Sequence, residues 1–299
     1  TEGINAQIAI PTNYLSQFRE ELYEISFLNG IRLNFAVDDA EAEFTFLKLK
    51  IKVRDKILAD GLIDKTFDVT NKGKHLNARE FNDLTNNNET ILIDFRNHYE
   101  SEVGYFKGAI LPDVDTFRES LPHIESTYLK GQEDKNIVMY CTGGIRCEKA
   151  SAWFKHRGFK NVHQLEGGII KYANEVRELG IENKFIGKNF VFDERRGERI
   201  TDDVIAVCHQ CGEAADTHTN CMNHSCHLLF IQCTSCMAKM ENCCSQECLE
   251  ITHLPEETQK ELRKGIENSN QIFKKGRSQK LIFKANKEKP LSLIQQSNK

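Results

Sequence analysis

The sequence predicts a multidomain protein that contains an α+β domain, a parallel α/β domain and a cysteine-rich module, in that order. Alternating apolar residues around one helix indicate the first domain, and short apolar strands separated by helices indicate the second. Nine of the eleven cysteines fall between Cys208 and Cys248 and indicate the third. A length of 299 residues suits two or three domains.

The composition excludes two classes of protein. Hydrophobic residues make up 39% of the chain and charged residues 28%, as in folded domains rather than in disordered chains. No stretch approaches the roughly 18 consecutive apolar residues of a membrane-spanning helix. We therefore expect a globular protein with no membrane contact.

Residues 1–66 alternate apolar and polar side chains around one helical segment. The alternation predicts strands over residues 4–10, 31–37 and, more loosely, 44–51. Between the first two, apolar residues from Leu15 to Ile25 recur at helical spacing. This combination predicts an incomplete α+β sandwich.

Residues 67–183 change to the pattern of a doubly wound α/β domain. A capping box at residues 77–80 predicts a helix start. The apolar runs 91–95 and 136–140 are typical of buried parallel strands, and a helix over 146–157 and a strand over 162–165 follow.

A short loop in this domain has the features of a reactive thiol site. Cys141, Thr142, Gly143, Gly144, Ile145 and Arg146, called the Cys141 loop below, connect a predicted strand to a predicted helix. Such a loop points backbone N–H groups inward at the positive end of the helix. The same field lowers the pKa of a thiol and favours a nucleophilic thiolate, so we expect Cys141 and Arg146 to be catalytic. A buried structural cysteine is the alternative.

Three further residues are candidate supporting groups. Cys147 is either a resolving thiol or a small buried helix residue. Asp94 and Arg96 follow a predicted parallel strand, at the sheet edge where sites form, and are either an ion pair that braces the loop or substrate contacts.

Residues 184–253 form the predicted cysteine-rich module. Short paired spacings predict up to two tetrahedral Zn²⁺ sites of a structural kind, although reduced thiols or disulfides are alternatives. The spacings do not show which pairs share a metal, and pairing the first with the third and the second with the fourth is one option. The candidate ligands are Cys208, Cys211, Cys221, Cys226, Cys233, Cys236, Cys243, Cys244 and Cys248.

Residues 254–299 form a basic tail. From Lys260 onward eleven Lys or Arg residues stand against three Glu residues, a charge of +8 within a chain whose net charge is −4. The excess indicates a polyanionic partner such as nucleic acid, with a solvated tail as the alternative. The candidate RNA contacts are Lys274, Lys275, Arg277 and Lys280.

The middle domain resembles a rhodanese. The resemblance rests on residues 91–96, the Cys141 loop and the stretch Leu165–Gly168. Rhodaneses carry persulfide sulfur on the first cysteine of this loop, whereas related cysteine phosphatases have one more residue between cysteine and arginine. Four residues separate Cys141 from Arg146, which fits the sulfur-handling loop.

A longer resemblance covers nearly the whole chain. Residues 2–6, 141–150, 192–199 and 208–211 occur in one order and resemble the bacterial rhodanese-domain tRNA uridine hydroxylases. The resemblance implies a ferredoxin-like (acylphosphatase-like) first domain, of which this chain would lack the first strand and helix. It also implies 5-hydroxyuridine formation at the wobble position in the anticodon stem-loop of tRNA, with molecular oxygen as co-substrate, in the cytoplasm.

Two chemical roles for Cys141 remain open at this point. Its thiolate either adds to C6 of the uracil or relays the oxidant as a persulfide or sulfenic acid. A different function, a sulfurtransferase that carries persulfide sulfur on Cys141, is the main alternative to the hydroxylase.

Overall fold

The computed structural model describes residues 2–37, 45–46, 48–264 and 275–283, which fall into two compact units. The first unit comprises residues 1–97 and 105–202, and the second comprises residues 98–104 and 203–299. Among the described residues no helix is both long enough and apolar enough to cross a membrane.

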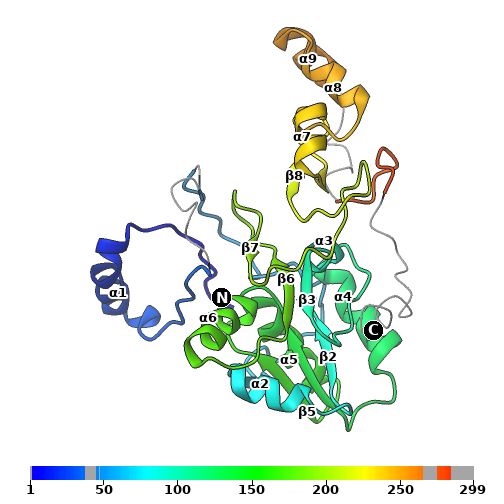
Figure 1. Ribbon diagram of the computed structural model, residues 1–299. Helices are drawn as coiled ribbons and strands as arrows, with labels where there is room; N and C mark the ends of the chain where they lie inside the picture. The colour runs from blue at the N-terminus through cyan, green and yellow to red at the C-terminus, as the bar shows by residue number, and fades with distance from the viewer. Residues whose placement is uncertain (1, 38–44, 47, 265–274, 284–299) are drawn as a thin grey trace. The chain divides into compact units, whose positions relative to one another are not determined.

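The centre of the first unit is a parallel sheet of four strands in the order β1-β5-β4-β2. Figure 1 labels two of these strands, β2 and β5. Register pairs β2 with β4 so that Asp94 lies opposite Tyr140. The predicted doubly wound α/β domain is therefore confirmed. Its strands are β1 (Lys74–Leu76), β2 (Ile91–Asp94), β4 (Asn136–Tyr140) and β5 (Asn161–Leu165).

Helices cover both faces of this sheet and close two apolar cores. On one face α4 (Phe117–Ile124) and α5 (Ile145–His156) pack against Ile93, Ile137 and Met139. On the other, α2 (Ala78–Thr85) and α6 (Gly168–Leu179) pack against strand residues that point the opposite way, as alternation along a strand requires. The predicted capping box is present, because Asn77 accepts a bond from the Glu80 N–H and the Glu80 carboxylate accepts one from the Asn77 N–H.

A smaller sheet and a π-helical turn complete the α/β domain. Strands β3 (Gly104–Phe106), β6 (Phe185–Asn189) and β7 (Glu198–Arg199) follow one another in that sheet, with β6 and β7 antiparallel. The turn η4 (Glu125–Leu129) extends α4.

The N-terminal region contains the predicted helix but not the predicted strands. The helix α1 (Leu15–Glu24) lies between the 3₁₀ turns η1 (Thr12–Tyr14) and η2 (Ser26–Leu28). The described residues of 4–10, 31–37 and 44–51 form no strand, so that prediction is wrong there. Alternation sets the direction of side chains, but a strand also needs a hydrogen-bonded neighbour. Without one, Leu49 and Ile51 stay 90% and 81% exposed.

The second unit is built around cysteines rather than around a large apolar core. A hairpin of β8 (His218–Asn220) and β9 (Leu229–Ile231) is followed by three helices, α7 (Thr234–Met240), α8 (Gln246–Thr252) and α9 (Glu256–Arg263). The short helix α3 (His98–Ser101) belongs to this unit as well. The main buried cluster of the second unit contains five cysteines together with Leu228, Phe230 and Leu281.

Candidate active site and metal centres

The Cys141 loop forms a tight cradle between β4 and α5. Cys141 follows the last residue of β4, and α5 begins at Ile145. Gly144 adopts a φ of 94° as the N-cap of α5, a left-handed conformation that favours glycine. The Gly144 N–H donates to Cys141 Sγ over 3.2 Å, so the sulfur faces the positive end of the helix.

The Cys141 thiol is acidic although it is fully buried. Burial by itself raises the pKa of a thiol. A hydrogen bond from the Cys147 thiol, the charge of Arg146 and backbone N–H groups of residues 146 and 147 act against burial and lower the pKa of Cys141 to about 6. The thiolate is therefore the main form at neutral pH.

Arg146 braces the loop from within. Its side chain is only 8% exposed, and its Nη2 donates to Thr142 Oγ1 over 3.3 Å. The guanidinium also lies over the Phe192 ring, 5.7 Å from the ring centre. Its charge thus acts on Cys141 from a position that the loop itself fixes.

Cys147 is buried in the apolar core of the domain and hydrogen-bonds with Cys141. Burial and the neighbouring Cys141 raise its own pKa well above the usual range, so it stays a neutral donor. The structure thus places it both as a small core residue and as a partner of the thiolate.

Asp94 and Arg96 form a fully buried ion pair beside the cradle. Arg96 Nη2 lies 2.6 Å from Asp94 Oδ2, and Arg96 Nε donates to both carboxylate oxygens. The guanidinium also lies 5.6 Å from the ring centre of Tyr140, which precedes Cys141. Of the two predicted roles, this arrangement favours bracing.

A double-glycine turn at Gly167 and Gly168 packs against the backbone of the Cys141 loop. These glycines were not predicted as site residues. The N–H groups of Ile169 and Ile170 donate to the carbonyl oxygens of Cys141 and Thr142 over 3.0 and 3.2 Å. A Cβ atom on Gly168 would lie 2.4 Å from the Cys141 oxygen. The signal in the sequence was two glycines, Gly167 and Gly168, one residue beyond a predicted parallel strand.

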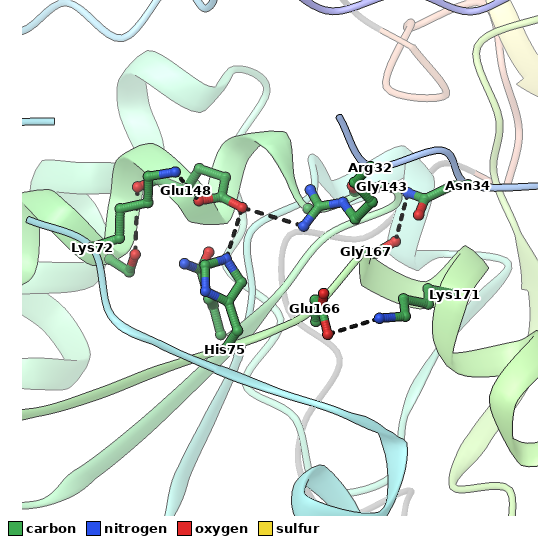
Figure 2. A network of polar contacts seen from close by, with 12 residues as sticks. Arg32, Asn34, Lys72, His75, Gly143, Glu148, Glu166, Gly167 and Lys171 are labelled. Carbon is green, nitrogen blue, oxygen red and sulfur yellow. Dashed lines mark hydrogen bonds and ion pairs between the residues drawn. The ribbon is translucent and has the colours of Figure 1, made fainter. Parts of the chain in front are cut away.

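The N-terminal segment also reaches the cradle, which no pattern in the sequence indicated. Figure 2 shows Asn34 beside Gly143 and Gly167, and Arg32 beside Glu148. Asn34 Nδ2 donates to the Gly143 oxygen over 3.4 Å and to the Gly167 oxygen over 3.2 Å. Arg32 Nη1 lies 3.4 Å from Glu148 Oε1.

Glu148, one residue beyond Cys147, contacts three basic side chains (Figure 2). Lys72 Nζ and His75 Nε2 each lie 2.9 Å from its carboxylate oxygens, and Arg32 is the third partner. Burial raises the pKa of Glu148, but His75 and Lys72 more than compensate and lower it. The carboxylate is therefore charged and anchors the N-terminal segment to α5.

Eight cysteines of the second unit form two groups of four. Cys208, Cys211, Cys233 and Cys236 make one group, and Cys221, Cys226, Cys244 and Cys248 make the other. Within each group all sulfur atoms lie within 4.8 Å of one another. The first cysteine pair thus groups with the third and the second with the fourth, which is one of the arrangements that the spacing left open.

These groups suit a tetrahedral metal. Zn–S bonds of about 2.3 Å place tetrahedral ligand sulfurs about 3.8 Å apart. Sulfur separations of 3.6 Å for Cys211–Cys233 and 3.7 Å for Cys226–Cys244 are close to that value. The donor set of four thiolates fits Zn²⁺.

Cys243 differs from the other predicted ligands. Its sulfur belongs to neither group and lies 3.7 Å from Thr252 Oγ1. The prediction that Cys243 is a ligand is therefore corrected, because its neighbour Cys244 takes the place in the second group. Cys243 hydrogen-bonds with Cys221 of the second group but is not one of its four mutually close sulfurs.

The basic residues proposed for RNA contact are engaged within the second unit where they are described. Lys275 Nζ lies 3.8 Å from the centre of the Tyr99 ring, and Lys280 Nζ lies 2.8 Å from Glu247 Oε2. Arg277 is half-buried, and burial lowers its pKa. Lys274 lies outside the described residues.

Comparison with known proteins identifies three family regions in the chain. Residues 77–175 match the rhodanese-like domain, residues 1–57 match the UPF0176 acylphosphatase like domain, and residues 186–249 match the rhodanase C-terminal family. A rhodanese-like domain protein from Staphylococcus aureus covers 33% of this chain and 90% of its own length at 21% identity, with a TM-score of 0.28.

Curated relatives match over most of the chain. The tRNA uridine(34) hydroxylase of Photorhabdus laumondii is 55% identical over 277 residues, which are 92% of this chain and 78% of the relative. That of Leptospira interrogans is 55% identical over 276 residues, which are 92% of this chain and 74% of the relative. The chain therefore belongs to the tRNA uridine(34) hydroxylase family.

Proposed function

We propose that this chain hydroxylates C5 of uridine 34, the wobble base of tRNA, and that Cys141 is the catalytic residue. The observation that carries the proposal is a thiol with a pKa of about 6 at the N-terminus of α5, in a chain 55% identical to named tRNA uridine(34) hydroxylases. Membership of the family gives the substrate, and the acidic thiol gives the nucleophile that the reaction needs.

The chemistry begins with the weak reactivity of uracil C5. The Cys141 thiolate adds to C6, so an S–C6 bond forms and the C5=C6 electron pair moves onto C5 and the O4 enolate. C5 then attacks the oxidant, and loss of the C5 proton with departure of Cys141 restores the double bond. Molecular oxygen supplies one atom to C5, while a two-electron reductant and two protons reduce the other atom to water.

Arg146 and the backbone N–H groups of the loop assist the addition of the thiolate because they lie close to the sulfur. The Gly144 N–H and the guanidinium of Arg146 stabilise the thiolate before attack and when it leaves. The neighbouring Phe192 ring is 49% exposed and offers an aromatic surface on which a splayed-out anticodon base would stack. A tRNA substrate is met in the cytoplasm, where we expect the protein to work.

The two cysteine groups are proposed to hold two structural Zn²⁺ ions. Each group already contains four sulfurs, which leaves no ligand position for a water or a substrate. The ions would fold the second unit and take no part in the oxidation.

Nucleoside mass spectrometry tests the proposed function. A bacterial strain that lacks its own member of this family is complemented with the wild-type chain, with Cys141→Ser or with Cys243→Ser. Cys243 is a matched control, because it is buried but belongs neither to the cradle nor to the metal groups. We expect 5-hydroxyuridine derivatives with the wild type and Cys243→Ser only. If the Cys141→Ser strain keeps its 5-hydroxyuridine but contains less thiolated uridine than the wild type, the result would instead favour the sulfurtransferase.

The role of the thiolate is tested separately with an anticodon stem-loop that carries 5-fluorouridine. Because fluorine at C5 cannot leave as a proton does, the C6 adduct should accumulate as a protein–RNA band that Cys141→Ser abolishes. Absence of that band with an active protein would favour the persulfide or sulfenic acid relay.

A further inference from the structure

One peptide group links Asn34 of the N-terminal segment to the catalytic sulfur. The carbonyl oxygen of Gly143 accepts a hydrogen bond from Asn34 Nδ2 over 3.4 Å. The N–H of the same peptide group belongs to Gly144 and donates to Cys141 Sγ over 3.2 Å. Because a peptide group is planar and trans, fixing its oxygen also fixes the direction of its N–H.

The backbone on either side of this peptide group is flexible. Rotating its plane changes only one torsion of Gly143 and one of Gly144, and glycine adopts many backbone conformations at low cost. A Cβ atom on Gly143 would meet nothing within 4 Å, whereas Gly144 packs against the Gly167–Gly168 turn, where a Cβ atom on Gly168 would lie 2.8 Å from the Gly144 nitrogen. A flipped peptide would turn a carbonyl oxygen toward the thiolate and remove its donor.

The second hydrogen of the Asn34 amide ties the loop to the double-glycine turn. It donates to the Gly167 oxygen over 3.2 Å, and one amide has two donors for these two bonds (Figure 2). Gly167 precedes Gly168, which packs directly under the Cys141 oxygen. Asn34 therefore contacts both turns that surround the sulfur.

Arg32 fixes the segment in this place. Its Nη2 would lie 3.1 Å from a Cβ atom on Gly144, and its Nη1 pairs with Glu148 on α5. The segment thus contacts the Cys141 loop and the adjoining part of α5 through residues 32 and 34.

We propose that Asn34 is a positioning residue for Cys141: it holds the Gly143–Gly144 peptide so that the Gly144 N–H stays aimed at the sulfur, and it locks this peptide to the Gly167 turn. The N-terminal segment is then part of the catalytic apparatus. Polarisation of the carbonyl by Asn34 also makes the N–H a better donor.

The test uses the full-length protein and measures how readily Cys141 is alkylated as the pH changes. Iodoacetamide labelling is followed for the Cys141 peptide by mass spectrometry in the wild type, Asn34→Ala and Asn34→Asp. Asn34→Asp keeps the shape of the side chain but cannot donate when it is ionised. The groups that act on the Cys141–Cys147 pair, Arg146 and Asp94, are the same in all variants.

Asn174→Ala is the matched control. Asn174 Nδ2 donates a hydrogen bond to the Phe35 oxygen over 3.0 Å. This variant therefore removes a side-chain hydrogen bond to the same segment but leaves the cradle unchanged. We expect both Asn34 variants to raise the alkylation midpoint by about one pH unit, the effect of weakening one hydrogen bond to a thiolate. The control should keep the wild-type midpoint. Because Asn34 is exposed, all variants should melt as the wild type does.

A kinetic measurement joins the proposal to catalysis and rests on the proposed function. Since Asn34 acts through Cys141, both Asn34 variants should lose about twofold in kcat at pH 7 and about tenfold at pH 5, the loss of thiolate that a midpoint raised from about 6 by about one pH unit produces, with little change in KM. Unchanged midpoints in both Asn34 variants, or an equal shift in Asn174→Ala, would overturn the positioning role. Shifted midpoints in a protein with no hydroxylase activity would instead overturn the proposed function alone.

Discussion

At the scale of single residues, the central fact is an acidic thiol inside an apolar core. Burial opposes a charge on Cys141, and its pKa falls to about 6 only because several donors converge on the sulfur. Only one of these donors, Arg146, carries a charge, and the others are neutral groups of the loop and of α5. The positions of these groups around the sulfur therefore set the pKa of Cys141, and with it the reactivity of its thiolate.

Cys147 gives the first prediction at this scale. Cys147→Ala removes a thiol donor, so the pKa of Cys141 should rise and its alkylation at pH 7 should slow, while the rate at pH 9 or above should change little. Cys147→Ser keeps an O–H donor and should restore most of the reactivity. Alkylation of Cys147→Ala that follows the wild-type pH profile would contradict this role for Cys147.

The ion pair beside the cradle gives the second prediction. Asp94→Ala leaves Arg96 charged in a fully buried position and should lower the free energy of unfolding by about 3–5 kcal/mol. Removing the exposed carboxylate of the Asp134–Lys160 pair should cost far less, because water screens that pair. Urea unfolding of both variants measures the difference, and similar costs would contradict the bracing role.

At the scale of elements, the start of α6 is as important to the site as the start of α5. The first turn of α6 donates two backbone N–H groups to the loop that carries Cys141. This close contact requires glycine at residue 168, where φ is +66° and a Cβ atom would lie 2.4 Å from the Cys141 oxygen.

The third prediction compares the two ends of α6. Gly168→Ala should displace the Cys141 loop and abolish most hydroxylation. Gly180→Ala has a similar φ of +59° but would place its Cβ atom in open space, so it should cost only about 1 kcal/mol of backbone strain. Hydroxylation activity and thermal melting of the two variants separate the effect of backbone strain, which both share, from that of the steric collision, which only Gly168→Ala introduces. Equal losses of activity would show that strain alone is responsible.

At the scale of the whole molecule, two units fold by different means. The first has large apolar cores on both faces of a parallel sheet, whereas the main buried cluster of the second has five cysteines among its eight residues. With the proposed Zn²⁺ ions bound, a small unit of this kind would draw much of its folding free energy from the metal.

The fourth prediction concerns this dependence. Metal analysis should find two Zn²⁺ ions per chain, and Cys211→Ser or Cys226→Ser should each remove one of them. Cys243→Ser should keep both, because Cys243 lies outside both groups. Chelation should expose the backbone of residues 203–264 to protease and spare residues 67–183. Equal zinc loss in all three variants would contradict the assignment of ligands.

Local patterns predicted the α/β domain because its strands and helix starts are encoded by neighbouring residues. The capping box at Asn77 and the apolar run of β4 are examples. Alternation failed in the N-terminal region because pairing depends on a second strand. Asn34 was missed for a similar reason: its partners lie 109 and 133 residues away, and only the fold brings them together.

The most direct measurement is the origin of the added oxygen atom in tRNA. Cells that express the wild-type chain or Cys141→Ser are grown under heavy-isotope oxygen gas, and the tRNA nucleosides are analysed by mass spectrometry. We predict that 5-hydroxyuridine carries the heavy atom with the wild type and is absent with Cys141→Ser. Unlabelled 5-hydroxyuridine, or labelled product with Cys141→Ser, would contradict an oxygen-dependent hydroxylation that passes through the Cys141 thiolate.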